Sequence, residues 1–290
     1  MTYFHRGARL MVWASSLAVA LTLYIFFILL GILGPTEIYL IPLEQRVNNS
    51  LALTLLAAIL PPSIVEFNNF RWLRGVDRNI PLLLRDLAEA VRSGETLIRA
   101  LEEAAKRDYG PISGYLERAM ARLSLTSDLE GSLRWLGESL VRPSAMRMAT
   151  ILVEASESGG RIVEVLEAAV SLFNEIAEYR DEREAQTRPY ILLAYMGSIV
   201  FMVISYVILF QFLAPLSTAS ETPEMTGVPI VQNVLDISYY RSILFWASVM
   251  ESVFGGLIAG KISRGHLAAG LIHSSILLGI SIAFFNIFTV

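Results

Sequence analysis

Apolar residues are concentrated in long runs that carry few charges, and five of these runs are long enough to be membrane spans. The first, residues 10–33, contains 24 residues and no charge. Since an α-helix rises about 1.5 Å per residue, this run can cross a hydrocarbon core about 30 Å thick. The other four runs cover residues 50–65, 190–213, 242–260 and 267–287. The pattern predicts an all-α, polytopic membrane protein with about five transmembrane helices.

A different pattern occupies the region between the second and third spans. From residue 71 to residue 188, apolar positions recur every three or four residues, which is typical of amphipathic helices. Turn residues interrupt this pattern at short intervals, and we expect six helices that form a compact bundle. The expected helices are Asn79–Gly94, Thr96–Arg107, Pro111–Leu123, Asp128–Val141, Pro143–Glu157 and Arg161–Arg188.

Charged residues follow the same division of the chain. Of the 50 charged side chains, 37 lie between residues 71 and 188. This distribution predicts a water-soluble insert between two membrane regions. We therefore expect an N-terminal membrane hairpin (1–70), a helical insert (71–188) and a C-terminal membrane region (189–290).

Basic residues near the span ends predict the orientation, because cytoplasmic loops carry an excess of Lys and Arg. Five crossings place nine such residues on one side and only Arg46 and Arg241 on the other. The N-terminus and the insert are therefore expected in the cytoplasm, and the C-terminus outside the cytoplasmic membrane. The nine are Arg6, Arg9, Arg71, Arg74, Arg78, Arg183, Arg188, Lys261 and Arg264.

The composition excludes several classes of site. No cysteine is present, so the chain has neither a disulfide framework nor a cysteine-ligated metal site. A net charge of −4 does not favour nucleic acid as a partner. The three histidines, His5, His266 and His273, lack the spacing of a metal-ligand set, and no nucleophile elbow or HExxH sequence occurs. We expect no cofactor and no enzymatic activity.

A glycine-rich stretch, VFGGLIAGKISRGH at residues 253–266, approaches the spacing of a phosphate-binding P-loop. A P-loop needs Ser or Thr after the lysine to hold Mg²⁺, and here Ile262 takes that place. The glycines also lie inside an apolar run instead of between a strand and a helix. Gly256 and Gly260 are better explained as a Gly-x-x-x-Gly pair that lets another membrane helix approach, with Lys261 as an interfacial anchor.

The insert contains an internal repeat. SGETLIRALEEAA from Ser93 and SGGRIVEVLEAAV from Ser158 share Ser-Gly and a later Leu-Glu, and a fainter echo surrounds Gly131. Glycines in this pattern are typical of helix ends that precede an inward-facing apolar stripe. The repeat positions are Ser93, Gly94, Gly131, Ser158, Gly159 and Gly160.

The order of RSGETLIRALEEAA, GSLRWLGESL and VEASESGGRIVEVLE, followed directly by a long span, resembles the type II secretion F-domain family. These are platform proteins of type II secretion, type IV pili, tight-adherence pili and archaella, and the span resembles the archaeal branch. The resemblance implies a non-enzymatic platform that couples a hexameric cytoplasmic ATPase to the assembly of pilin-like subunits. Many members carry two such units, so a single unit implies a second platform subunit, either identical or a paralogue.

The resemblance also directs attention to the basic residues nearest the membrane as candidates for contact with the ATPase. These are Arg71, Arg74, Arg78, Lys261 and Arg264, although the positive-inside bias alone suffices to explain each of them.

Two ionisable residues fall at membrane depth, where charges tend to face protein and to have partners. Glu251 and His273 are at comparable depth in the last two spans, and we expect them to pair and lock those helices together. The alternative function is a small transporter or channel component in which the two residues line a path for protons or ions.

Overall fold

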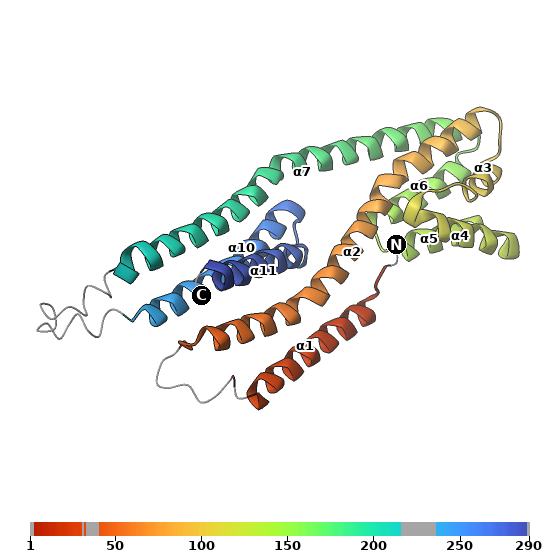
Figure 1. Ribbon diagram of the computed structural model, residues 1–290. Coiled ribbons are helices and arrows are strands. Elements are labelled where there is room, and N and C mark those ends of the chain that lie inside the picture. Colours follow the sequence, from red (N-terminus) through yellow and green to blue (C-terminus); the bar gives the residue numbers. More distant parts are fainter. Residues whose placement is uncertain (1–2, 31, 33–40, 216–235, 289–290) are drawn as a thin grey trace, which may run out of the picture. The chain divides into compact units, whose positions relative to one another are not determined.

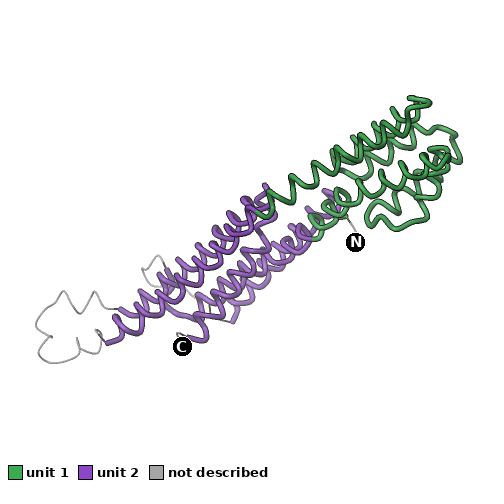
Figure 2. Tube along the Cα trace, turned by 90° about the horizontal axis from the view of Figure 1, so that it is seen from above, with its two compact units in different colours: residues 1–3, 68–185 green, residues 4–67, 186–290 purple. Residues whose placement is uncertain are grey.

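The computed structural model describes residues 3–30, 32, 41–215 and 236–288, and these contain helices and no strand (Figure 1). This confirms the all-α class. The chain divides into two compact units, coloured in Figure 2. The insert unit comprises residues 1–3 and 68–185, and the membrane unit comprises residues 4–67 and 186–290. The expected N-terminal hairpin and C-terminal membrane region thus pack within one unit.

The insert unit contains the C-terminal part of α2 (Gln45–Arg92) and the N-terminal part of α7 (Ile162–Val207). Between them lie four shorter α-helices and two 3-10 turns. They are α3 (Leu97–Ala104), η1 (Gly110–Ile112), α4 (Ser113–Thr126), α5 (Leu129–Ser139), α6 (Pro143–Glu157) and η2 (Gly159–Arg161).

Local capping chemistry explains where several of these helices begin. The Thr96 side chain accepts a hydrogen bond from the Arg99 N–H at the start of α3, and Asp128 accepts one from the Gly131 N–H at the start of α5. Helix α6 begins at Pro143, a first-turn position where the missing N–H costs nothing. These starts agree with the sequence pattern, because caps are local features.

The core of the insert unit is apolar and formed by every α-helix in it. Leu84 of α2, Leu101 of α3, Leu116 of α4, Leu136 of α5 and Leu152 of α6 are all completely buried. Helix α7 contributes Leu166, Ala169 and Phe173, which lie on one face of the helix at spacings of three and four residues. Complete burial of a leucine side chain stabilises a fold by about 1.5–3 kcal/mol, so this cluster holds the unit together.

Two of the six expected helices are not separate. Helix α2 continues from the second span through Pro61, Pro62 and Pro81 to Arg92, and α7 continues through Pro189 into the third span. The prediction that a new helix begins at Asn79 was therefore wrong. Its side-chain amide instead donates to the Gly75 carbonyl one turn earlier, at 2.7 Å. Tertiary packing overrides the proline signal here, because Ile80, Leu83, Leu84 and Leu87 are fully buried around it.

The membrane unit contains α1 (Arg6–Leu29), the remaining parts of α2 and α7, the π-helical turn η3 (Ile208–Leu213), α10 (Ile237–Arg264), η4 (Leu267–Gly270) and α11 (Leu271–Phe288). Five helices are long and apolar enough to cross a membrane, as predicted. Residues 31 and 33 of the first expected span lie outside the described residues.

Many large apolar side chains of the membrane unit are exposed on its surface, where contact with water would be unfavourable. Leu192, Leu193, Val200 and Ile204 of α7 are all roughly half exposed or more. The opposite face of α7 buries Ser198, Met202 and Ser205 instead. This arrangement suits a lipid environment, where outward apolar groups cost nothing and polar groups must find partners within the protein.

Candidate functional sites

Close backbone contacts in the membrane unit join α10 to α11 and to η4 at the two glycines that resembled a P-loop. A Cβ atom added to Gly256 would overlap the backbone of Ser274, and one added to Gly260 would overlap the backbone of Gly270. The Ser274 hydroxyl crosses the same contact and donates to the Val253 carbonyl at 2.7 Å. The glycines therefore lie where two helix backbones touch, the geometry expected of small residues in membrane helices.

Lys261 and Arg264 lie in the last turn of α10, which ends at Gly265 with a positive φ of 78°. Lys261 is exposed, whereas Arg264 is half buried with its guanidinium carbon 5.6 Å from the centre of the Phe67 ring. The stretch is therefore helical through the lysine and has no loop that could surround a phosphate group.

Glu251 and His273 both bind α7 and not each other. The Ser198 hydroxyl lies 2.8 and 2.6 Å from the two Glu251 carboxylate oxygens. The Tyr195 hydroxyl lies 3.0 Å from His273 Nδ1, and the two rings meet edge to face. Tyr195 and Ser198 are neighbours on one face of α7, so the two bonds join α7 to both α10 and α11.

The expected Glu251–His273 pair is therefore wrong: no hydrogen bond or ion pair joins them in the part of the chain that the structure describes. The prediction matched their depths along the helix axes but ignored rotation about those axes. At about 100° per residue, Glu251 is turned about 140° away from Gly256, and His273 about 100° away from Ser274. Because Gly256 and Ser274 form the contact line, the two ionisable groups point away from that line.

Other polar contacts in the membrane unit were not expected from the sequence. The Asn48 amide nitrogen donates to the Ser242 hydroxyl at 3.0 Å and its oxygen accepts from the Trp246 indole at 2.8 Å. Ser248 and Ser281 hydroxyls share a hydrogen bond of 2.8 Å. Serines and an asparagine inside apolar runs were the available signal, but their partners lie in other helices far along the chain.

The other basic candidates belong to the insert unit. Arg71, Arg74 and Arg78 are exposed on α2 and line a hollow of about 950 Å³. Arg74 pairs with Glu184 of α7 at 2.9 Å and lies over the Phe70 ring. Three of the five candidates for contact with the ATPase therefore line this hollow in the insert unit, and the other two, Lys261 and Arg264, belong to the membrane unit.

The two halves of the internal repeat share their local geometry. Ser93 and Ser158 each follow the end of a helix and donate from the hydroxyl to the carbonyl three residues earlier, both at 2.7 Å. The next residue is a glycine with positive φ in each case, 98° at Gly94 and 60° at Gly159. A side chain is disfavoured in this conformation, which explains the glycines as helix terminators.

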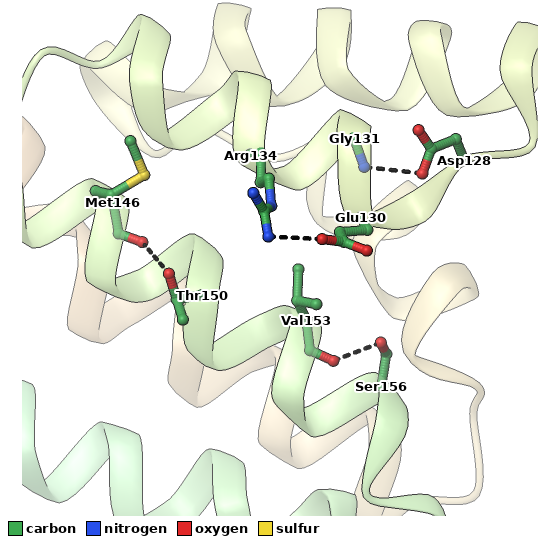
Figure 3. Close-up of polar contacts among 8 residues, drawn as sticks. All are labelled: Asp128, Glu130, Gly131, Arg134, Met146, Thr150, Val153 and Ser156. Carbon is green, nitrogen blue, oxygen red and sulfur yellow. Dashed lines mark hydrogen bonds and ion pairs between the residues drawn. The ribbon is translucent and has the colours of Figure 1, made fainter.

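Gly131 and Gly160 differ from this pattern. Gly131 lies in the first turn of α5, where its N–H binds the Asp128 carboxylate at 2.8 Å (Figure 3). A Cβ there would collide with that carboxylate. The weaker repeat segment around Gly131 therefore lies at the start of a helix and not after its end. Gly160 lies in η2 with open space where a Cβ would be.

Asp77 is a junction in the insert unit that the sequence pattern did not reveal. Its carboxylate accepts hydrogen bonds from Arg142 and from the Ser144 hydroxyl, and it lies 3.0 Å from Arg180. Burial opposes ionisation, but the hydrogen bonds and positive charges outweigh it, and the pKa of Asp77 is lowered from its ordinary value. One carboxylate therefore joins α2, α6 and α7.

Taken together, the helical insert and the five apolar helices with inward polar groups define a multi-pass membrane protein. Residues 83–210 match the family model described as "Type II secretion system (T2SS), protein F". These residues are therefore similar to the domain of that family, which agrees with the resemblance drawn from the repeat. Proteins of this family are membrane platforms, not enzymes, and they work with secretion ATPases.

The chain is also similar to the uncharacterized protein MJ1286 of Methanocaldococcus jannaschii. The two are 25% identical over 239 residues, which cover 81% of this chain and 37% of the relative. The chain thus spans little more than a third of the length of this curated relative. No solved structure matches the chain.

Proposed function

We propose that the protein is a platform component of a type IV pilus-like or type II secretion-like machine, coupling a cytoplasmic hexameric ATPase to the assembly of pilin-like subunits. The observation that supports this most is the extent of the family match. Residues 83–210 include α3 to α6, the whole repeat and the membrane part of α7. The family match thus covers both the water-soluble insert and a membrane span.

The continuity of α2 and α7 supports a coupling role. Each is a single helix that contributes residues to both units. We propose that these helices transmit movement of the insert to the membrane helices.

The family resemblance implies two units in many members, and the repeat pattern of this sequence shows one. We therefore propose that this platform pairs with a second F-domain subunit, either another copy or a paralogue. Cross-linking of differently tagged copies in native membranes tests the homomeric case, and their failure to co-purify would favour a paralogue.

Binding to the ATPase can be tested with a charge reversal at an exposed, predicted cytoplasmic residue. We expect Lys261→Glu to weaken co-purification of the secretion ATPase several-fold, roughly what loss of one close ionic contact costs. Arg46→Glu is the matched control, because Arg46 is also exposed but lies on the opposite side of the predicted topology. Unchanged ATPase binding by Lys261→Glu, with normal insertion, would remove Lys261 from the proposed contact.

The orientation has an equally direct test. Since the native chain has no cysteine, single cysteines at positions 46 and 261 report sidedness without background. In intact cells, a membrane-impermeant thiol reagent should label Arg46→Cys and not Lys261→Cys until the cells are opened. The reverse pattern would invert the topology and exclude an ATPase contact at Lys261.

A further inference from the structure

The hollow in the insert unit carries positive charge that its own lining does not neutralise. Four exposed arginines line it, three on α2 and Arg118 on α4, together with one carboxylate, Asp108. Asp108 already accepts hydrogen bonds from the Gly110 N–H at 2.8 Å and from the Ser113 hydroxyl at 3.3 Å. No carboxylate of the described residues is within ion-pair distance of Arg78 or Arg118.

The same unit has an acidic stripe on α7, which consists of Glu164, Glu175, Glu178 and Glu182, all exposed. At about 100° per residue, these four side chains lie within about 60° of one another, opposite the buried Leu166 and Phe173. Neither Glu175 nor Glu178 has a basic side chain within ion-pair distance in the described part of the chain. Like charges three or four residues apart destabilise a helix, so a basic partner would relieve the repulsion.

The acidic stripe of one chain cannot reach the α2 wall of the hollow in the same chain. Helix α7 contacts α2 through Arg180, which lies 3.0 Å from Asp77, and through Glu184, which lies 2.9 Å from Arg74. Arg180 and Glu184 are on the opposite side of α7 from the stripe, at about 100° per residue. The stripe is therefore turned away from α2, and a contact between stripe and hollow requires a second molecule.

The two sets of charges have the same spacing. Arg71, Arg74 and Arg78 follow one another at three and four residues, and so do Glu175, Glu178 and Glu182. Each set covers about 10 Å of helix.

The two sets also lie at the same level along the paired helices. The contacts of Arg180 with Asp77 and of Glu184 with Arg74 show that α2 and α7 run antiparallel. They place residues 178–182 of α7 level with residues 74–79 of α2. A second copy rotated about an axis along these helices therefore presents its acidic stripe at the level of the arginines.

We propose that two copies of this protein associate through these surfaces, with the acidic stripe of one copy lying along the hollow of the other. Arg78 and Arg118 then bind carboxylates of the partner subunit. A twofold arrangement forms this contact twice and closes a dimer. The inference rests on the proposed pairing of platform subunits and assigns the second place to another copy of this chain.

The test uses two differently tagged copies of the full-length protein, co-expressed and purified through one tag in a neutral detergent. Arg78→Glu/Arg118→Glu in both copies should lower co-purification of the second tag roughly tenfold, because like charges then face each other. Glu175→Arg/Glu178→Arg in both copies should cause the same loss.

The matched control is Arg147→Glu/Arg161→Glu, which reverses two exposed arginines of the same unit that do not line the hollow. Co-purification should remain at the wild-type level in this variant.

A mixed pair separates the contact from a general effect of charge or a folding defect. When one copy carries Arg78→Glu/Arg118→Glu and the other carries Glu175→Arg/Glu178→Arg, opposite charges meet again at both contacts of a twofold dimer. Co-purification should return to the wild-type level, which also requires that both variants fold.

Each contrary outcome identifies what has failed. If wild-type copies did not co-purify, both this inference and the homomeric form of the proposed function would be excluded. If wild-type copies co-purified but the charge variants matched them, or the mixed pair stayed apart, only this contact would be excluded. If Arg78→Glu/Arg118→Glu kept the dimer but lost the ATPase, the hollow would bind the ATPase and not a second copy.

Discussion

The two units of this protein differ in the kinds of side chain that they bury and expose. Of the fifteen polar side chains that are buried among the described residues, three belong to the insert unit and twelve to the membrane unit. The large exposed apolar side chains show the same preference: they lie mainly in the membrane unit and gather on α1, α7, α10 and α11. In water, apolar burial drives packing, whereas in lipid, close backbone contacts and hydrogen bonds between helices must do so.

The largest expected effect tests whether burial of apolar side chains stabilises the insert unit. Leu136→Ala empties a completely buried position of α5 and should destabilise the insert by about 2–5 kcal/mol, because a cavity remains. Hydrogen exchange of peptides from α3 to α6 in the full-length protein measures this locally. Leu125→Ala, at a position 86% exposed in the same unit, should change protection very little.

The membrane unit should instead be most sensitive to added volume. Gly260→Ala places a methyl group into the backbone of Gly270 and should destabilise the contact of α10 with η4 by about 1–3 kcal/mol. Thermal unfolding in lipid nanodiscs reports the loss. The control is Gly279→Ala in α11, where a Cβ meets nothing within 4 Å. Equal losses of thermal stability in both variants would show that the effect of Gly260→Ala arises from helix propensity and not from the backbone contact.

Asp77 adds a polar contact to the otherwise apolar packing of the insert unit. Asp77→Asn should destabilise the unit by about 1–3 kcal/mol at neutral pH, because Arg142 and Arg180 lose the carboxylate that they bind. The folded-state pKa lies below the ordinary value of 3.8. Its contribution is therefore fully present above that value and is lost as the pH falls through the folded pKa.

Hydrogen exchange at α2, α6 and α7 across the acidic range measures this contribution. Wild type should lose more protection on acidification than Asp77→Asn. If wild type and Asp77→Asn lost protection equally on acidification, protonation of Asp77 would not be coupled to the stability of the unit.

The smallest effect is expected from a single polar contact in the membrane unit. Ser198→Ala removes the hydroxyl that Glu251 binds and should cost about 0.6 kcal/mol, the average for hydrogen bonds between membrane helices. Val203→Ala, on the lipid-facing side of α7, is the control in the same nanodisc unfolding assay.

Glu251→Gln discriminates the transporter alternative. Proteoliposomes with a pH gradient and an internal pH dye should show the same leak for wild type and Glu251→Gln if the residue only holds helices together. A proton flux that disappears in Glu251→Gln would instead favour the transporter.

Local chemistry made several elements predictable. The caps at Thr96 and Asp128, the proline start of α6 and the glycines after Ser93 and Ser158 depend on residues within a few positions of one another. Local signals failed at Asn79 and Pro81, where buried leucines keep α2 continuous despite two residue types that are common at helix starts. A local pattern is overridden wherever long-range packing stabilises the helix by more than the proline costs.

The candidate sites show the same limit. The Gly256–Gly260 spacing correctly marked a close helix contact, because the spacing puts both glycines on one face of one helix. The partners of Glu251 and His273 were missed, because depth in the membrane can be read from a sequence but rotation about the helix axis relative to a third helix cannot.

The sequence alone determined the helical class, the five spans, the charged insert and the repeat, because hydrophobic periodicity and turn chemistry act over short stretches of chain. Only the tertiary structure decided that α2 and α7 run unbroken, that α7 binds both Glu251 and His273, and that Asp77 joins three helices. It also brought Arg78 and Arg118, forty residues apart, to one hollow. Such contacts depend on which helix faces meet, and packing of the whole unit selects those faces.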